Sequence, residues 1–243
     1  MSTKYEITSL VLENRMLSAD TCALDFYAPE IAENSLPGQF VMIEAAGKFL
    51  RRPISIAGSS GKRITLTIRI IGDGTKILCS LRRNMRVKML GPLGNPFPDC
   101  DGKKILAGGG IGIAPILFLA QKTLDDDTIL IYGEQTAENL ISSEFLPENT
   151  EIATDDGSSG FCGNVCEFLS TFPPAQIFAC GPMPMLQKLS GIGKEWNVQT
   201  WISLEARMAC GFGVCHGCVV DTKDGYKRVC TEGPVFNANE IFL

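Results

Sequence analysis

Residues 104–115 read KILAGGGIGIAP, and they decide the fold class of the second half of the chain. The first four residues predict a strand, the glycines predict a tight loop, and a helix is expected from there to about residue 124. Pro115 suits the first turn of that helix, where no backbone N–H is needed. A strand, a glycine loop and a helix in this order start a strand–helix–strand unit.

The same loop is a candidate phosphate-binding site. Its glycines let a phosphate approach the backbone closely and meet free N–H groups at the start of a helix. The candidate residues are Gly108, Gly110, Gly112 and Pro115, and the pattern is G-x-G-x-x-P rather than the G-x-G-x-x-G of the standard dinucleotide fold. Taken alone, the loop is weak evidence, because tight strand–helix packing also selects glycine.

Strands and helices continue to alternate after this loop. Further strands are predicted at 128–132, 151–154, 177–179 and 198–204, and helices at 138–145, 163–170 and 184–189. This alternation predicts a doubly wound α/β domain with a parallel sheet, which we assign to residues 99–205.

Two strand ends in this domain carry further candidate residues. Glu134 ends the strand after the glycine loop, where an acidic side chain would accept hydrogen bonds from ribose hydroxyls. No arginine or lysine stands between residues 133 and 145 to bind a 2′-phosphate, so NADH is favoured over NADPH. Cys180, Gly181 and Pro182 stand at another strand end, where open α/β sheets bind ligands.

The first 98 residues have a different rhythm. Short runs rich in β-branched residues, separated by turn signals, predict strands at 5–12, 22–27, 40–44, 54–57, 64–71 and 87–90. Six short strands in this length predict a small antiparallel β-barrel, with one helix at 76–81.

Residues 206–243 hold four cysteines and little periodic structure, so a metal centre is expected to organise this third domain. Cys210, Cys215, Cys218 and Cys230 have the spacing C-x4-C-x2-C-x11-C, and the first three match the plant-type [2Fe–2S] pattern. Gly211 and Gly213 can adopt the positive φ that such a loop needs to turn backbone N–H groups toward sulfur.

A structural zinc site is the alternative for this cluster, although zinc ribbons use two C-x2-C pairs and only Cys215 and Cys218 have that spacing. A [4Fe–4S] ferredoxin needs C-x2-C-x2-C, and a Rieske centre needs two histidines where the chain has only His216. Cys162 and Cys166, one helical turn apart, are expected to pack in the core.

The composition limits where the protein works and what it binds. The 243 residues carry a net charge of −5, which excludes a basic surface for nucleic acid or anionic lipid. Residues 105–120 are apolar, but the stretch is too short and too rich in glycine to span a bilayer. Ten cysteines without a signal peptide favour free thiols or a metal site over disulfides, and we expect a cytoplasmic protein.

Taken together, these motifs resemble the ferredoxin reductase-like flavoproteins, which join a flavin-binding barrel to a nicotinamide-binding α/β domain. The barrel motif of that family, R-x-[YF]-[ST], is matched at its ends by Arg52, Pro53, Ile54 and Ser55, with Ile54 in place of the usual aromatic residue. The resemblance implies that Arg52 holds the FAD pyrophosphate and that Ser55 lies near flavin N5. It also implies FAD contacts at Arg69, Ile70, Ile71, Gly74 and Thr75.

Residues 204–218, LEARMACGFGVCHGC, narrow the resemblance to the electron-transfer subunits of the NAD-dependent class of bacterial dihydroorotate dehydrogenase. The resemblance covers essentially the whole chain and implies a heterotetramer with two FMN-containing catalytic subunits, acting in pyrimidine biosynthesis. It implies electron flow between NAD, FAD, the cluster and the partner's FMN, with Cys180 in a positioning role near the nicotinamide.

Three other functions stay open. The chain could be the small subunit of a related complex, such as a ferredoxin:NADP⁺ transhydrogenase or a sulfide dehydrogenase, which shares all three motifs. It could be a self-contained NADH:acceptor reductase. Finally, it could be a regulatory module that zinc stabilises and that binds nucleotides without redox chemistry. Such a protein would be colourless.

Overall fold

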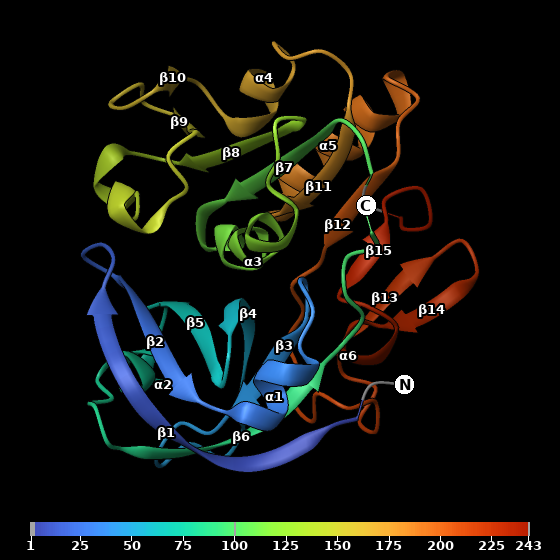
Figure 1. Ribbon diagram of the computed structural model, residues 1–243. Coiled ribbons are helices and arrows are strands. Elements are labelled where there is room, and N and C mark those ends of the chain that lie inside the picture. Colours follow the sequence, from blue (N-terminus) through green and yellow to red (C-terminus); the bar gives the residue numbers. More distant parts are fainter. Residues whose placement is uncertain (1–2, 100, 243) are drawn as a thin grey trace.

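The computed structural model describes residues 3–99 and 101–242, and its amino-terminal part is a closed antiparallel barrel (Figure 1). The strands follow the order β1-β2-β5-β4-β3-β6 around the barrel. Their bounds are Tyr5–Met16 (β1), Thr21–Tyr27 (β2), Phe40–Ile43 (β3), Arg52–Ser60 (β4), Arg63–Arg69 (β5) and Arg86–Leu93 (β6). The predicted six-stranded barrel is confirmed.

Apolar side chains fill this barrel. Leu24, Phe26, Ile56, Ile64 and Leu66 are fully buried, and their strands pair in a closed ring that leaves no free sheet edge. Two short helices complete the domain, α1 (Pro29–Asn34) and α2 (Asp73–Cys79). The helix predicted at 76–81 is thus present, but it begins three residues earlier.

A seven-stranded sheet in the order β10-β9-β8-β7-β11-β12-β15 forms the second layer. Its strands are β7 (Lys104–Gly109), β8 (Thr128–Glu134), β9 (Thr150–Thr154), β10 (Phe161–Cys162), β11 (Gln176–Cys180), β12 (Thr200–Ser203) and β15 (Val235–Asn237). The strands from β10 to β12 are parallel, as predicted, and β15 pairs antiparallel to β12.

Helices cover both faces of this sheet, and one of them joins it to the barrel. Figure 1 shows α3 (Ile113–Thr123) between the sheet and the barrel, while α4 (Val165–Leu169) and α5 (Met183–Glu195) lie away from the barrel. Phe118 of α3 belongs to the barrel core, and the Gln121 side-chain amide exchanges hydrogen bonds with the Ser59 backbone at 3.1 and 3.2 Å. The two domains therefore share a packed joint.

The helix predicted over 138–145 is wrong. Two single 3₁₀ turns, η2 (Ala137–Asn139) and η3 (Ser143–Phe145), stand there instead. The backbone N–H groups between the turns bond elsewhere: Ile141 donates to the Tyr132 hydroxyl and Ser142 to the carbonyl of Leu17. Tertiary partners have replaced the bonds that a helix would make internally.

The carboxyl-terminal segment has more regular structure than the sequence predicted. A hairpin of β13 (Val219–Thr222) and β14 (Gly225–Arg228) precedes the short helix α6 (Val229–Glu232). After α6, β15 returns to the sheet of the second domain, so the boundary at residue 205 stays a prediction. In the described ranges, no helix is long and apolar enough to cross a membrane.

Candidate functional site

A cavity of about 630 Å³, which we call the barrel cavity, lies between the barrel and residues 203–208. Its barrel wall includes most of the residues predicted to hold FAD, namely Arg52, Pro53, Ile54, Ser55, Arg69, Ile71 and Thr75. Ile70 packs against the barrel core instead, and Gly74 does not line the cavity. Its volume lies in the range of cofactor pockets.

Gly74 leaves room for the Arg52 side chain. A Cβ at Gly74 would overlap the Arg52 guanidinium and displace it from its place against the start of α2. Arg52 Nη1 also donates to the carbonyl of Leu50 at 2.5 Å. The Thr75 hydroxyl is engaged within the turn, where it accepts from the N–H of Ile71 at 2.9 Å. Arg52 is thus a cation of the barrel cavity that packs against the start of α2.

The opposite wall carries three titratable groups, which are Cys180 at the end of β11 and Glu205 and Arg207 after β12. Burial raises the pKa of the Cys180 thiol, and the nearby Glu205 carboxylate raises it further. Cys180 therefore stays protonated at neutral pH and is no nucleophile. The enclosing walls also raise the pKa of Glu205, although its side chain faces the open cavity.

A second cavity of about 760 Å³, which we call the loop cavity, opens where the carboxyl ends of β7, β8, β9 and β11 meet. Gly109 and Gly110 of the glycine loop line it, together with Glu134 and Pro182. β8 and β9 extend the sheet on one side of β7, and β11 and β12 extend it on the other side. The sheet edge at such a switch point is where α/β folds bind nucleotides.

The other predicted loop residues support this cavity from behind. A Cβ at Gly112 would collide with the carbonyl of Cys180, so glycine allows the loop to touch the end of β11. Gly108 packs in the same way against Ile113, and Pro115 is buried in the first turn of α3. These residues and Gly181 do not line the loop cavity. Their predicted NAD contacts stay predictions.

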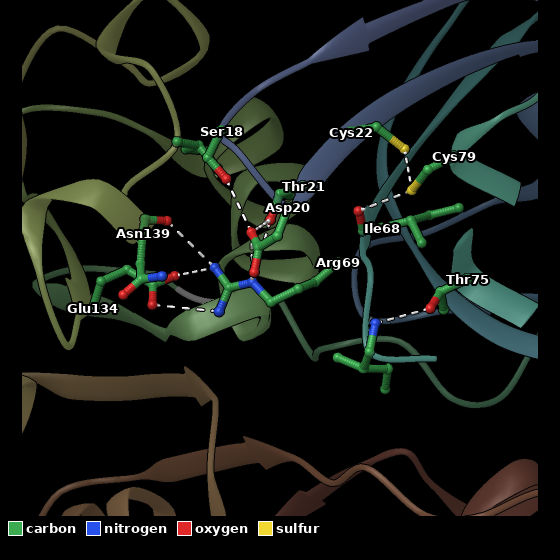
Figure 2. A network of polar contacts seen from close by, with 12 residues as sticks. Ser18, Asp20, Thr21, Cys22, Ile68, Arg69, Thr75, Cys79, Glu134 and Asn139 are labelled. Carbon is green, nitrogen blue, oxygen red and sulfur yellow. Dashed lines mark hydrogen bonds and ion pairs between the residues drawn. The ribbon is translucent and has the colours of Figure 1, made fainter. Parts of the chain in front are cut away.

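Glu134 lines the loop cavity but is already engaged by an arginine from the barrel. Figure 2 shows the Arg69 guanidinium facing the Glu134 carboxylate, with Nη1 3.3 Å from Oε2 and Nη2 bonded to Oε1. The Tyr132 hydroxyl donates to the same Oε1 at 2.8 Å. Arg69 comes from 65 residues away, so the sequence window around Glu134 gave no sign of it.

Asp155, just after β9, is an acidic side chain of the loop cavity that sequence reasoning missed. It lines the loop cavity, and in the described part of the chain no side-chain hydrogen bond or ion pair engages its carboxylate. Its backbone N–H donates to the carbonyl of Glu134 at 3.1 Å, which fixes the residue beside the end of β8. The signal was present in the sequence, because Asp155 follows a predicted strand in the same way as Glu134.

Acidic groups outnumber basic groups in the loop cavity. Its lining has four carboxylates and two cations, listed here together: Asp20, Glu134, Asp155 and Glu167, against Arg69 and Lys188. A 2′-phosphate would add two negative charges to this cavity, which disfavours NADPH by Coulomb repulsion.

The four clustered cysteines meet as two pairs. The backbone N–H of Cys215 donates to the Cys210 sulfur at 3.5 Å, and that of Cys230 donates to the Cys218 sulfur at 3.4 Å. Burial alone would raise the pKa of Cys210, but backbone N–H groups led by that of Cys215 lower it to about 6. At least one thiol is thus prepared to act as a thiolate ligand.

This arrangement suits a two-iron cluster. Across residues 3–99 and 101–242, no three His, Cys, Asp or Glu side chains converge as one metal ion requires. Two pairs of thiols, with N–H groups directed at the sulfurs, fit two bridged irons with two thiolates each. Gly211 and Gly213 have the predicted positive φ of 78° and 92°.

The cluster loop is continuous with the barrel cavity. Met208 lines that cavity, and the first ligand candidate, Cys210, follows two residues later. A Cβ at Gly211 would collide with Met42 of β3, so the loop is seated directly on the barrel. Away from the cluster, Cys166 is buried as predicted, whereas the prediction for Cys162 is wrong because β10 is an edge strand and leaves it exposed.

Comparison with known proteins agrees with this geometry. Residues 205–242 match the model of the iron-sulfur cluster binding domain of dihydroorotate dehydrogenase B. A solved structure described as an NADH-dependent reduced ferredoxin-NADP oxidoreductase, studied for flavin-based electron bifurcation, is 25% identical with a TM-score of 0.88. The match covers 97% of this chain and 90% of that one.

Two sequence relatives carry the same name, dihydroorotate dehydrogenase B (NAD(+)), electron transfer subunit. The one from Caldanaerobacter subterraneus subsp. tengcongensis is 35% identical over 249 residues, covering 99% of this chain and 100% of that protein. The one from Desulforamulus reducens is 38% identical over 251 residues, covering 95% and 96%. Both relatives match over nearly their whole length, and the chain therefore belongs to the family of dihydroorotate dehydrogenase B (NAD(+)) electron transfer subunits.

Proposed function

We propose that this chain carries electrons between NAD and the FMN of a dihydroorotate dehydrogenase catalytic subunit, through a bound FAD and a [2Fe–2S] cluster. It acts in the cytoplasm, in pyrimidine biosynthesis, as part of a heterotetramer with two subunits of each kind. The observation that carries this proposal is the continuity of the three sites. The loop cavity adjoins the barrel cavity at Arg69, and residues 204–208 run from the barrel cavity into the cluster loop.

The cofactors supply the electron chemistry, because a flavin exchanges a hydride with nicotinamide and single electrons with an iron–sulfur cluster. The barrel residues bind and orient. Arg52, held against Gly74, neutralises the pyrophosphate of FAD, and the Ser55 hydroxyl lies in the same wall to donate to the ring edge.

Residues on the opposite wall control proton and nicotinamide positions. Cys180 keeps its proton and acts by shape, as a small packed group between the glycine loop and the barrel cavity. Glu205 has a raised pKa and faces the barrel cavity, so it can hold a proton beside the flavin. In the loop cavity, Asp155 accepts hydrogen bonds from ribose hydroxyls, which is the role first expected of Glu134.

The partner docks where the cluster comes close to the surface. Cys215 is exposed, and Phe212 and Val214 beside it are 44% and 71% exposed. Apolar side chains of this size on a surface loop fit a protein interface better than free solvent. A partner seated there would bring its own flavin near the cluster and exclude water from it.

Co-purification from the native host, followed by assay of dihydroorotate-dependent NAD⁺ reduction, tests this function. We expect an FMN-containing partner, equal subunit numbers, and iron with acid-labile sulfide in the anaerobic preparation. Recovery of this chain without an FMN-binding partner would contradict the dihydroorotate assignment. Absence of iron and sulfide would contradict the whole chain of cofactors.

A second function has a specific observation in its favour. The similarity to the ferredoxin-NADP oxidoreductase covers 97% of this chain, so the same arrangement of sites also fits the small subunit of a transhydrogenase. Reduction of NAD⁺ by reduced ferredoxin, with no response to dihydroorotate, would select that function. The excess of carboxylates in the loop cavity favours NAD(H) as the nucleotide for this subunit in either complex.

A further inference from the structure

Arg69 is the single described residue that lines both the barrel cavity and the loop cavity. It is the last residue of β5 and thus belongs to the barrel, but its guanidinium reaches across to the nucleotide domain. Its side chain is 17% exposed, and that of Glu134 is 4% exposed. The resemblance to flavoproteins assigned Arg69 to FAD, whereas its nearest partners all line the other cavity or lie beside it.

The guanidinium is held from two sides. On the nucleotide side it forks onto both oxygens of Glu134, and Nη2 lies 3.4 Å from the carbonyl of Asn139. On the barrel side Nε lies 3.2 Å from Thr21 Oγ1 and 3.5 Å from Asp20 Oδ1 (Figure 2). A planar fork with five N–H donors is the group best suited to bidentate pairing with carboxylate or phosphate.

Arg69 also faces the glycine loop. Its Nη1 lies 3.5 Å from the position that a Cβ at Gly110 would occupy, and Gly110 lines the loop cavity. The backbone of Gly109 and Gly110 is the place where an anion is expected, at the start of α3. The guanidinium and the loop therefore border the same space from opposite domains.

The Glu134 carboxylate already pairs with one side of the Arg69 guanidinium. A phosphate that entered would compete with it, because both groups pair with the same face of the fork. Glu134 would not be left without a partner by the exchange, since the Tyr132 hydroxyl donates to it at 2.8 Å. The network is thus arranged so that Arg69 can change its anion without leaving a buried carboxylate unbonded.

We propose that Arg69 binds the pyrophosphate of the nicotinamide dinucleotide, and that Glu134 is the internal carboxylate that competes with it. The inference rests on the proposed function in one respect, namely that the loop cavity takes NAD(H). It makes one barrel residue a shared element of two sites, so that the flavin domain itself holds the nucleotide. It also gives Glu134 a role different from ribose binding.

Calorimetric titration with ADP-ribose tests this inference on the full chain loaded with FAD and its cluster. ADP-ribose carries the pyrophosphate and both riboses but no nicotinamide, so no electron transfer enters the readout. Arg69→Ala should weaken binding roughly tenfold or more, as expected for loss of a charged hydrogen-bonded pair. FAD content is measured in each variant, because Arg69 also lines the barrel cavity, and ADP-ribose binding is expressed per FAD-loaded chain.

Glu134→Gln should have the opposite effect. It removes the competing charge while keeping the size of the side chain, so ADP-ribose should bind severalfold more tightly. The double variant Arg69→Ala/Glu134→Gln has no unpaired buried carboxylate, and it should still bind more weakly than Glu134→Gln. Arg63→Ala is the matched control, because Arg63 is the first residue of the same strand and pairs with Asp25 away from both cavities.

The outcomes separate the two proposals. Failure of the wild-type protein to bind ADP-ribose would overturn the proposed function together with this inference. Tight binding by wild type and equally tight binding by FAD-loaded Arg69→Ala would overturn the inference alone. Weaker binding by Glu134→Gln would show that Glu134 contacts the ligand itself, and the competition would be refuted.

Discussion

The barrel cavity and the cluster loop lie next to each other in space, but different forces hold them in place. The walls of the barrel cavity stand on strands whose inward side chains, such as Ile56 and Leu66, are fully buried. The cluster loop leaves Phe212 and Val214 largely exposed and brings four thiols together instead. Apolar burial stabilises the first region without any cofactor, whereas the second depends on metal–sulfur bonds.

The largest effect that separates the two regions should come from Cys215→Ser. Loss of one of four thiolates should remove the cluster, so iron content and electron transfer to the partner should both fall to background. NADH should still bleach the bound FAD, because the barrel and loop cavities keep their structure. Iron analysis and anaerobic absorbance spectra measure the two results in one preparation.

The control for that variant is Cys162→Ser, which removes an exposed thiol on β10, outside the cluster loop. It should keep full iron content and full activity. Unchanged iron in Cys215→Ser would contradict the ligand assignment. Loss of flavin bleaching there would contradict the independence of the two regions.

The next largest effect should come from Gly74→Ala, which disturbs the barrel cavity alone. The new Cβ would collide with the Arg52 guanidinium and push it out of its position. FAD affinity should fall roughly tenfold, the usual scale for losing a charged hydrogen bond, while the cluster is retained. Flavin release on dilution, followed by fluorescence, measures the change.

Gly72→Ala is the matched control, because a Cβ there meets nothing within 4 Å and its φ of 174° is ordinary extended backbone. It should bind FAD like wild type. Equal losses of FAD from the two variants would mean that the start of α2 tolerates no side chain at all, and the specific role of Arg52 would be lost.

The two regions also differ in how far the sequence predicted them. Arg52 and Ser55 stand three residues apart on one strand, and Cys210, Cys215 and Cys218 lie in one loop, so local spacing carries the chemistry. The loop cavity draws on residues that only tertiary structure brings together.

The pair of Arg69 and Glu134 illustrates why the rest could not be predicted. Position at a strand end placed Glu134 correctly on a cavity, but the arginine that engages it belongs to another domain. The helix predicted over 138–145 failed for the same reason, because Tyr132 and Leu17 take up backbone groups that local propensity assigns to a helix.

A smaller effect is expected from Asp155→Ala, which tests the loop cavity without touching the barrel. Removal of a carboxylate that accepts from ribose hydroxyls should weaken ADP-ribose binding by roughly tenfold or less. FAD and iron should stay unchanged. Asp126→Ala is the control and should bind like wild type. Asp126 precedes β8, whereas the loop cavity lies at the other end of β8. Equal binding by both variants would return the ribose role to Glu134.

The smallest effect concerns Glu205, where the two regions meet. Burial raises the pKa of this carboxyl, so the folded protein still holds the proton at pH values where the unfolded chain has released it. By linkage, its contribution to stability is fully present below the unfolded pKa of about 4.3 and is lost as pH rises through the folded pKa. The loss should be modest, because the side chain faces the open cavity and water screens its charge.

Glu205→Gln should remove this dependence and flatten the change of Tm with pH in the FAD-free protein. Thermal unfolding of wild type and variant across that pH range measures the difference. If the wild-type Tm instead rises with pH relative to the variant, Glu205 is stabilised as an anion, and a cation must face it. A group of that kind could not hold a proton beside the flavin, so the same titration decides whether the barrel cavity has a proton carrier of its own.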